Sequence, residues 1–215
     1  MKKVITEKHV LEAAKSGKSV EIEANSLITP LAKDTAKLKG VRFQKKSDKP
    51  AEPQSAPKEA TKFVVQSVAI GSDHGGFDYK KELIPYLQKL GLTVVDVGTV
   101  STDAVDYPDF AYAVGKMVQT KQTDIGIMID GAGIGSAMAC NKIPEILAAC
   151  CHNEFTAKNA REHNHANVLT LGSKVLGIEV CKAIIHAFIS TSPDMGRHLN
   201  RVKKIKDIEA KFSKK

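Results

Sequence analysis

From residue 64 to the C-terminus, short apolar runs alternate with stretches whose apolar residues recur at helical spacing. Uninterrupted apolar runs are typical of strands that are buried on both faces, and strands separated by helices form parallel sheets. The pattern therefore predicts an α/β fold, with a Rossmann-like (flavodoxin-like) parallel sheet of five strands and helices on both faces. The predicted strands are residues 64–70, 93–97, 125–129, 147–151 and 167–171.

A stretch rich in proline and charge divides the chain. Residues 44–59 contain three prolines and show no apolar periodicity, as expected of a solvated linker. We therefore predict a small N-terminal α+β module over residues 1–43, a flexible linker over 44–61 and one larger domain over 62–215. No internal repeat is apparent. A module of about 43 residues buries little apolar surface, so a partner is expected to support its fold.

Composition and charge narrow the class of protein. Hydrophobic residues at 42% and charged residues at 26% are globular values, and no apolar run approaches the roughly 20 residues of a membrane span. No apolar signal region follows the first three residues, so we expect a cytoplasmic protein that does not enter a membrane. Residues 1–45 hold ten basic and five acidic side chains, but the domain after residue 60 holds 19 and 16. Since aromatic residues make up only 5%, nucleic acid is not a predicted partner.

The cysteines lie among apolar neighbours and form no CxxC pair. They are interpreted as reduced thiols of the core rather than as metal ligands or disulfides. They are Cys140, Cys150, Cys151 and Cys181.

Polar residues follow the first predicted strand directly. Asp73 and His74 stand before Gly75 and Gly76, at the strand end where parallel sheets bind ligands. The alternative is a simple cap, with Asp73 at the N-terminus of the helix that begins near Phe77 and His74 in solvent.

The third strand ends in Asp130 and a glycine-rich turn, residues 131–136. Backbone N–H groups in such a turn can converge on an anion or a developing oxyanion. The glycines follow a G-x-G-x-G pattern, which is not a dinucleotide fingerprint, and a tight strand-to-helix turn remains the alternative. Asp130 favours a functional interpretation, because a carboxylate directly after five apolar residues needs a role or a helix to cap.

Two further groups are basic. Residues 161–165 close a helix before the fifth strand, where a histidine can also be a mere C-terminal cap. Arg197 and Arg201 are spaced i, i+4, which would place them on one helical face and allow them to bind a phosphate. The alternative is a solvated basic helix that continues through Lys203 and Lys206.

Six motifs in order make the chain, from Val68 to about Phe212, resemble the ribose-5-phosphate isomerase B family, which includes galactose-6-phosphate isomerase subunits. Each motif is weak alone, but six in family order are specific. They are residues 72–77 (SDHGGF), 106–108 (DYP), 131–135 (GAGIG), 141–142 (NK), 161–169 (REHNHANVL) and 196–202 (GRHLNRV).

The resemblance implies an aldose–ketose isomerase of a sugar phosphate that needs no metal and no organic cofactor. It also implies a homodimer, or a dimer of dimers, whose active sites include residues of both subunits. Asp130 and His163 would be the catalytic base and the proton donor for ring opening. The implied substrate-binding residues are Asp73, His74, Tyr107, Gly131, Ala132, Gly133, Ile134, Gly135, Ser136, Asn164, Arg197 and Arg201.

The chain departs from the family pattern at the base. Many members have a cysteine where this chain has Asp130, and another branch has a glutamate where this chain has Ser136. A carboxylate can remove a proton α to a carbonyl, so Asp130 can serve. Ribose 5-phosphate is the substrate that the family implies. A tetrose or deoxy-sugar phosphate, or a non-catalytic binding or assembly subunit, is the alternative.

The N-terminal segment resembles that of some enzymes of bacterial microcompartments, the protein-shelled organelles. The resemblance rests on residues 5–8 (ITEK), 28–34 (ITPLAKD) and 40–41 (GV). It implies a location inside a microcompartment, with shell or core proteins as partners. The alternative is a generic appendage for oligomerisation or stability.

Overall fold

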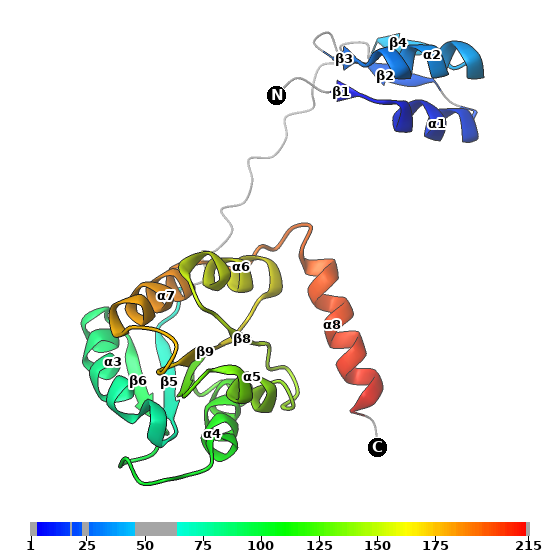
Figure 1. Cartoon of the computed structure of the whole chain (residues 1–215). Helices are drawn as coiled ribbons and strands as arrows, with labels where there is room; N and C mark the ends of the chain where they lie inside the picture. The colour runs from blue at the N-terminus through cyan, green and yellow to red at the C-terminus, as the bar shows by residue number, and fades with distance from the viewer. Residues whose placement is uncertain (1–3, 18, 23–25, 46–63, 214–215) are drawn as a thin grey trace. The chain divides into compact units, whose positions relative to one another are not determined.

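The computed structural model describes residues 4–17, 19–22, 26–45 and 64–213. The chain divides into two compact units, residues 1–60 and 61–215 (Figure 1). Most of the predicted linker lies outside the described residues. The linker was predicted to start at residue 44, which is two residues too early, because Gln44 and Lys45 belong to a strand. This strand is held by backbone pairing, which apolar periodicity does not reveal.

The larger unit contains the predicted five-stranded parallel sheet, in the order β6-β5-β7-β9-β8. The chain moves from β5 outward to β6 and then returns to β7 on the other side of β5. This reversal is a topological switch point, where open α/β sheets bind ligands beyond the carboxyl ends of the strands. The strands are β5 (Ser67–Ser72), β6 (Thr93–Asp96), β7 (Ile125–Asp130), β8 (Ala148–Cys150) and β9 (Val168–Gly172).

Helices cover both faces of this sheet, as predicted (Figure 1). One face packs against α3 (Phe77–Lys89), α6 (Glu154–Asn164) and α7 (Ile178–Ser190). The other face packs against α4 (Tyr107–Gln119) and α5 (Ile134–Cys140). The last helix, α8 (Leu199–Phe212), contacts α6. No helix that the structure describes is long and apolar enough to span a bilayer.

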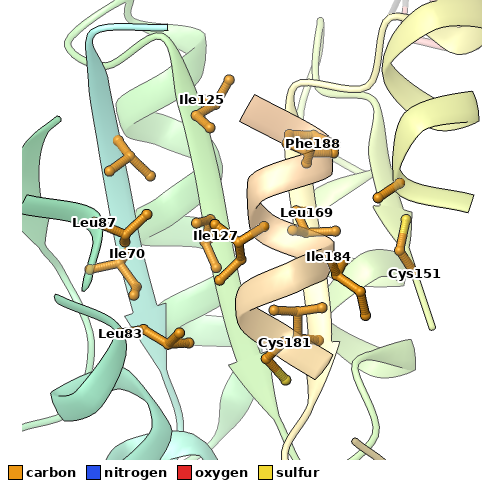
Figure 2. Close-up of a cluster of buried hydrophobic side chains, with 14 of the residues drawn as sticks. Ile70, Leu83, Leu87, Ile125, Ile127, Cys151, Leu169, Cys181, Ile184 and Phe188 are labelled. Atoms are coloured by element: carbon orange, nitrogen blue, oxygen red, sulfur yellow. The ribbon is translucent and has the colours of Figure 1, made fainter. Parts of the chain in front are cut away.

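The core shows why the side chain of Asp130 lies beneath α5. Side chains alternate along a strand, and Ile125 and Ile127 of β7 belong to the cluster that α3 and α7 cover (Figure 2). Residues 126, 128 and 130 therefore face α4 and α5. Gly126 lets α4 approach closely, since a Cβ there would come within 2.5 Å of Val114.

The four cysteines are free thiols, as predicted. Cys140, Cys151 and Cys181 are buried, and Cys151 and Cys181 lie in the cluster of Figure 2. Cys150 is half-buried.

The N-terminal unit is an internal repeat with a period of 23 residues, so the expectation of no repeat was wrong. Strands β1 and β3 pair in parallel, as do β2 and β4, with Val4 opposite Leu27 and Val20 opposite Phe43. In the sequence, the repeat is visible in the residues that cap and end the two helices, and not in the residues along the helices themselves. The elements are β1 (Val4–Ile5), α1 (Glu7–Lys15), β2 (Val20–Ile22), β3 (Leu27–Ile28), α2 (Pro30–Lys39) and β4 (Phe43–Lys45).

Equivalent residues end and begin the two helices of the repeat. Thr6 and Thr29 are the N-caps of α1 and α2. Gly17 and Gly40 follow the helices with φ of 63° and 66°, a left-handed conformation that glycine adopts at no steric cost. The unit has its own apolar core, formed by Ile5, Val10, Ala13, Val20, Ala32 and Ala36.

Candidate active site

Asp73 lies where β5 ends, beside the end of β7. Its N–H donates to the carbonyl of Ile129 at 3.2 Å, which ties the two strand ends together. Its Oδ1 accepts the N–H of Gly76 at 3.0 Å and caps a short 3-10 turn, His74–Gly76. The alternative interpretation of Asp73 as a cap is therefore correct for its Oδ1 atom. The residue is buried next to the predicted ligand edge.

His74 is exposed beside Asp73 and contacts the loop that precedes α4. Its Nδ1 lies 3.2 Å from both the nitrogen and the carbonyl oxygen of Val105. The buried Lys80 anchors the other end of this loop, because its Nζ donates to both oxygens of Asp96, at 2.6 and 2.7 Å, and to the carbonyl of Thr99 at 2.8 Å. The loop that contacts His74 is thus held at both ends.

Asp130 caps the glycine-rich turn from within. Its Oδ1 accepts the N–H of Ala132 at 2.7 Å and the N–H of Gly133. Its Oδ2 accepts the N–H of Ser136 at 3.1 Å and also the Ser136 hydroxyl. The side chain is only 5% exposed, so four donors surround a nearly buried carboxylate. The structure therefore shows a tight strand-to-helix turn that the Asp130 carboxylate caps, and a catalytic role for Asp130 stays a prediction.

These bonds restrict which N–H groups of the turn can bind a substrate oxygen. Those of Ala132, Gly133 and Ser136 already have the Asp130 carboxylate as acceptor, so residues 131, 134 and 135 carry the candidates. The ring of Tyr107 packs on the backbone of Gly135, where a Cβ would come within 2.6 Å of the ring. Tyr107 therefore borders this end of the turn.

Sequence reasoning missed two residues at the same edge. The Ser173 hydroxyl donates to the carbonyls of Gly75, at 2.6 Å, and Asp130, at 3.1 Å. The N–H of Lys174 donates to the carbonyl of Gly131 at 3.0 Å, and its side chain passes over that glycine. Both residues follow β9 directly, so the rule that ligands bind beyond strand ends could have found them.

A second polar group surrounds the end of α6. The rings of His163 and His198 stack, with centroids 3.9 Å apart and an interplanar angle of 8°. Nε of Arg197 lies 3.0 Å from Nε2 of His198, and Nη1 of Arg201 lies 3.1 Å from its Nδ1. His198 was not predicted as a site residue, although it lies inside the matched motif.

The i, i+4 spacing predicted that the two arginines share one helical face. This prediction is wrong, because α8 begins only at Leu199. Arg197 lies before the helix, and the arginines approach His198 at its two ring nitrogens. Burial, then His163 and the two guanidinium groups, lower the pKa of His198. A neutral imidazole has one acceptor nitrogen, so an incoming anion would give one of the arginines a better partner.

His163 can act as a proton donor. Its Nδ1 lies 2.9 Å from Nδ2 of Asn159. With that amide as donor, the neutral ring carries its proton on Nε2, which faces away from Asn159. The carboxylate of Glu162 lies 3.9 Å from Nε2, and Asn164 is exposed one residue further along.

The two polar groups lie at opposite edges of the sheet. Asp73, His74, Asp130 and the turn follow the carboxyl ends of β5 and β7. Helix α6 begins after the carboxyl end of β8 and ends just before the amino end of β9, so His163 and Asn164 lie at the amino edge. A strand of five or six residues separates these edges by roughly 15–20 Å. One chain therefore does not bring the predicted site residues together.

Comparison with known proteins shows the family of this chain. A family model described as Ribose/Galactose Isomerase matches residues 68–205. Ribose-5-phosphate isomerase B of Escherichia coli is 39% identical over 145 residues, which are 67% of this chain and 97% of that protein. D-erythrulose-4-phosphate isomerase of Pectobacterium atrosepticum is 38% identical over 140 residues, which are 65% of this chain and 92% of that protein.

A solved structure is also similar. That of ribose-5-phosphate isomerase B of Clostridium thermocellum has a TM-score of 0.68 and 43% identity, with 69% of this chain and 100% of that chain covered. Fold and site define an α/β enzyme with polar groups beyond the strand ends. The chain belongs to the Ribose/Galactose Isomerase family and is a sugar-phosphate isomerase.

Proposed function

We propose that this enzyme interconverts D-ribose 5-phosphate and D-ribulose 5-phosphate in a homodimer, at sites that two subunits share. The observation that carries the proposal is the separation of the two polar groups. The carboxyl edge holds Asp73 and Asp130, whereas the amino edge holds His163 and the arginines, and a sugar phosphate needs both sets. A second copy that places its amino edge against the carboxyl edge of the first completes the site.

An exposed apolar stripe on α8 supports association with a second copy. Ile205, Ile208 and Phe212, at positions i, i+3 and i+7 of the helix, are 41%, 60% and 77% exposed. Apolar side chains at such spacing on one helix are typical of a surface that another protein covers.

The residues fit an enediolate mechanism. Asp130 removes the proton from C2, and the free N–H groups of the turn stabilise the negative charge that develops on the carbonyl oxygen. His163 of the other subunit donates a proton to the ring oxygen, which opens the sugar. Arg197 and Arg201 bind the phosphate, and Asn164, Asp73 and His74 bind hydroxyl groups.

The exchange of the C2 proton with solvent tests this proposal. In heavy water, the enzyme should incorporate deuterium at C2 of D-ribose 5-phosphate, as followed by NMR. D-erythrulose 4-phosphate is the second probe, because a relative is named for that sugar. A much higher kcat/KM for the tetrose phosphate would show that this sugar, and not D-ribose 5-phosphate, is the substrate. Absence of exchange with every sugar phosphate would favour a non-catalytic subunit.

Arg201→Ala should weaken the binding of phosphorylated sugars by about 1.5 to 3 kcal/mol, because the guanidinium makes charge-assisted hydrogen bonds to the phosphate. Binding of free ribose should hardly change. Isothermal titration of both ligands measures the difference, and Lys203→Ala, an exposed basic residue of the same helix, is the matched control. Equal losses for both ligands would give Arg201 a structural role instead.

We also propose that residues 1–60 direct the enzyme to a microcompartment. The unit has its own core and repeat, which supports a role separate from catalysis. The expected partners are shell or core proteins of the compartment.

Deletion of residues 1–60 should leave a folded, dimeric isomerase with unchanged kcat, because the second compact unit holds both polar groups. Fused to a fluorescent protein, residues 1–60 should co-purify with shells in a host that makes microcompartments, whereas the truncated enzyme should not. If the truncation abolishes activity, or the fusion stays diffuse, the N-terminal unit belongs to the catalytic assembly.

A further inference from the structure

The loop between β9 and α7, residues 173–177, is bound to the glycine-rich turn through its backbone. The N–H of Ser173 donates to the carbonyl of Asp130 at 2.8 Å, and the N–H of Lys174 donates to that of Gly131 at 3.0 Å. These two bonds need no particular side chain, because every residue except proline carries a backbone N–H. The β9–α7 loop would therefore keep its place if the side chain of Ser173 were replaced.

The hydroxyl of Ser173 connects this loop to a different segment. A hydroxyl has one proton to donate, and two carbonyl oxygens lie within reach, that of Gly75 at 2.6 Å and that of Asp130 at 3.1 Å. Gly75 is the nearer acceptor, and Asp130 already accepts the N–H of Ser173. The hydroxyl therefore donates mainly to Gly75, in the 3-10 turn His74–Gly76 that follows β5.

Gly75 lies where the His74–Gly76 turn meets the glycine-rich turn. A Cβ at Gly75 would come within 3.3 Å of Oδ1 of Asp73 and within 3.7 Å of the backbone nitrogen of Gly131. The N–H of Gly131 is one of the groups that remain for a substrate oxygen, and Asp73 and His74 directly precede Gly75. The hydroxyl of Ser173 thus acts at the point where these candidate substrate-binding groups meet.

The β9–α7 loop is also fixed at places that do not involve the hydroxyl of Ser173. The hydroxyl of Tyr79, on α3, donates to the carbonyl of Leu176 at 2.9 Å. The N–H of Leu176 donates to the carbonyl of Gly172 at 3.0 Å. Gly172 packs closely on the glycine-rich turn, since a Cβ there would come within 2.7 Å of the backbone of Ala132. The loop is therefore a fixed support to which the His74–Gly76 turn can be attached.

We propose that Ser173 is a positioning residue, whose hydroxyl holds the His74–Gly76 turn against the glycine-rich turn through its hydrogen bond to Gly75. The inference rests on the proposed function, because it takes Asp73 and His74 as groups that bind the substrate. Without the hydroxyl, the β9–α7 loop stays in place, but the His74–Gly76 turn loses one of its attachments. Asp73 and His74 then occupy more positions relative to the glycine-rich turn, which weakens their contacts with the sugar.

The first measurement is the KM for isomerisation of D-ribose 5-phosphate. Ser173→Ala should raise this KM by about tenfold, because displaced binding groups lose contacts that they make with the bound sugar. A merely structural role would reduce the amount of folded enzyme, which lowers the apparent kcat and leaves KM unchanged. Ser173→Thr keeps the hydroxyl and should keep KM within about threefold of the wild-type value.

The matched control is Ser67→Ala. The hydroxyl of Ser67 donates to Oδ2 of Asp124 at 3.0 Å and so joins β5 to the residue before β7, at the opposite edge of the sheet from Asp73. Its loss removes a similar connection between the same two strands, but KM should stay unchanged. An equal rise of KM in both alanine variants would overturn the proposal. If Ser173→Ala does not fold, Ser173→Cys takes its place, and its weaker donor should raise KM by about threefold.

The second measurement needs no substrate. Hydrogen exchange of the N–H of Gly76, which donates to Oδ1 of Asp73 at 3.0 Å, reports the opening of the His74–Gly76 turn. Ser173→Ala should accelerate this exchange by about tenfold, the effect of one lost hydrogen bond, and Ser67→Ala should not. An unchanged exchange rate in Ser173→Ala would overturn the role of Ser173, whatever the activity shows. Faster exchange with an unchanged KM would instead contradict Asp73 and His74 as substrate-binding residues, and with them the proposed function.

Discussion

Replacement of Asp130 by asparagine should lower kcat for C2 proton exchange by about a thousandfold, as expected for the loss of a positioned base. An amide cannot accept the substrate proton. Asp130→Cys should retain or restore activity toward D-ribose 5-phosphate, since a thiolate can serve as the base at this position. Turnover is measured by NMR in heavy water. Near-wild-type turnover of the asparagine variant would remove Asp130 from the mechanism.

The structure also predicts a loss of stability for Asp130→Asn. The amide keeps one oxygen for the N–H groups of Ala132 and Gly133 but presents its NH₂ to the N–H of Ser136. Two donors that face each other in a buried site should reduce the free energy of unfolding by about 1 to 3 kcal/mol. Thermal unfolding measures this effect separately, so that a lower kcat is not mistaken for unfolded enzyme.

Two inactive variants should restore each other's activity when mixed. Asp130→Asn damages the carboxyl edge and His163→Ala damages the amino edge, and each alone should lose about a hundredfold or more. If each site combines opposite edges of two subunits, a mixed dimer has one intact site and one doubly damaged site. After subunit exchange, a mixture of equal parts should reach about a quarter of wild-type activity, because about half of the dimers are mixed.

The matched control combines two variants of the same edge, Asp130→Asn and Asp73→Asn. Each site of that mixed dimer keeps one damaged carboxyl edge, so activity should not recover. Recovery in the control, or none in the first mixture, would show that the two edges do not meet across subunits. The two mixtures thus test the geometry of the site rather than the role of any single side chain.

The sheet was predictable because burial on both faces leaves an uninterrupted apolar run in each strand, and the residues after β5 and β7 could then be placed at one edge. Contacts between distant segments were not predictable. Ser173 and Lys174 carry no motif, and their position depends on the pairing of β9 with β7. His198 was not predicted from the sequence, and only the stacking of its ring on that of His163 places it in the second polar group.

The environment of Asp130 shows a second limit of sequence reasoning. A carboxylate directly after an apolar strand suggested that Asp130 is either a catalytic group or a cap. Residue types alone do not decide between these two roles. The answer depends on where the N–H groups of the turn point, which follows from the left-handed conformation of Gly133, with φ of 80°.

The repeat of the N-terminal unit has a consequence for the order of folding. Its strand pairs join residues 23 positions apart, such as Val20 and Phe43, whereas β5 and β7 pair Val68 with Ile125, which are 57 positions apart. Short loops close at a lower entropic cost, and chains dominated by local contacts fold faster. During synthesis from the N-terminus, the repeat can therefore reach its native structure while strands β5 and β7 of the larger unit are still being made.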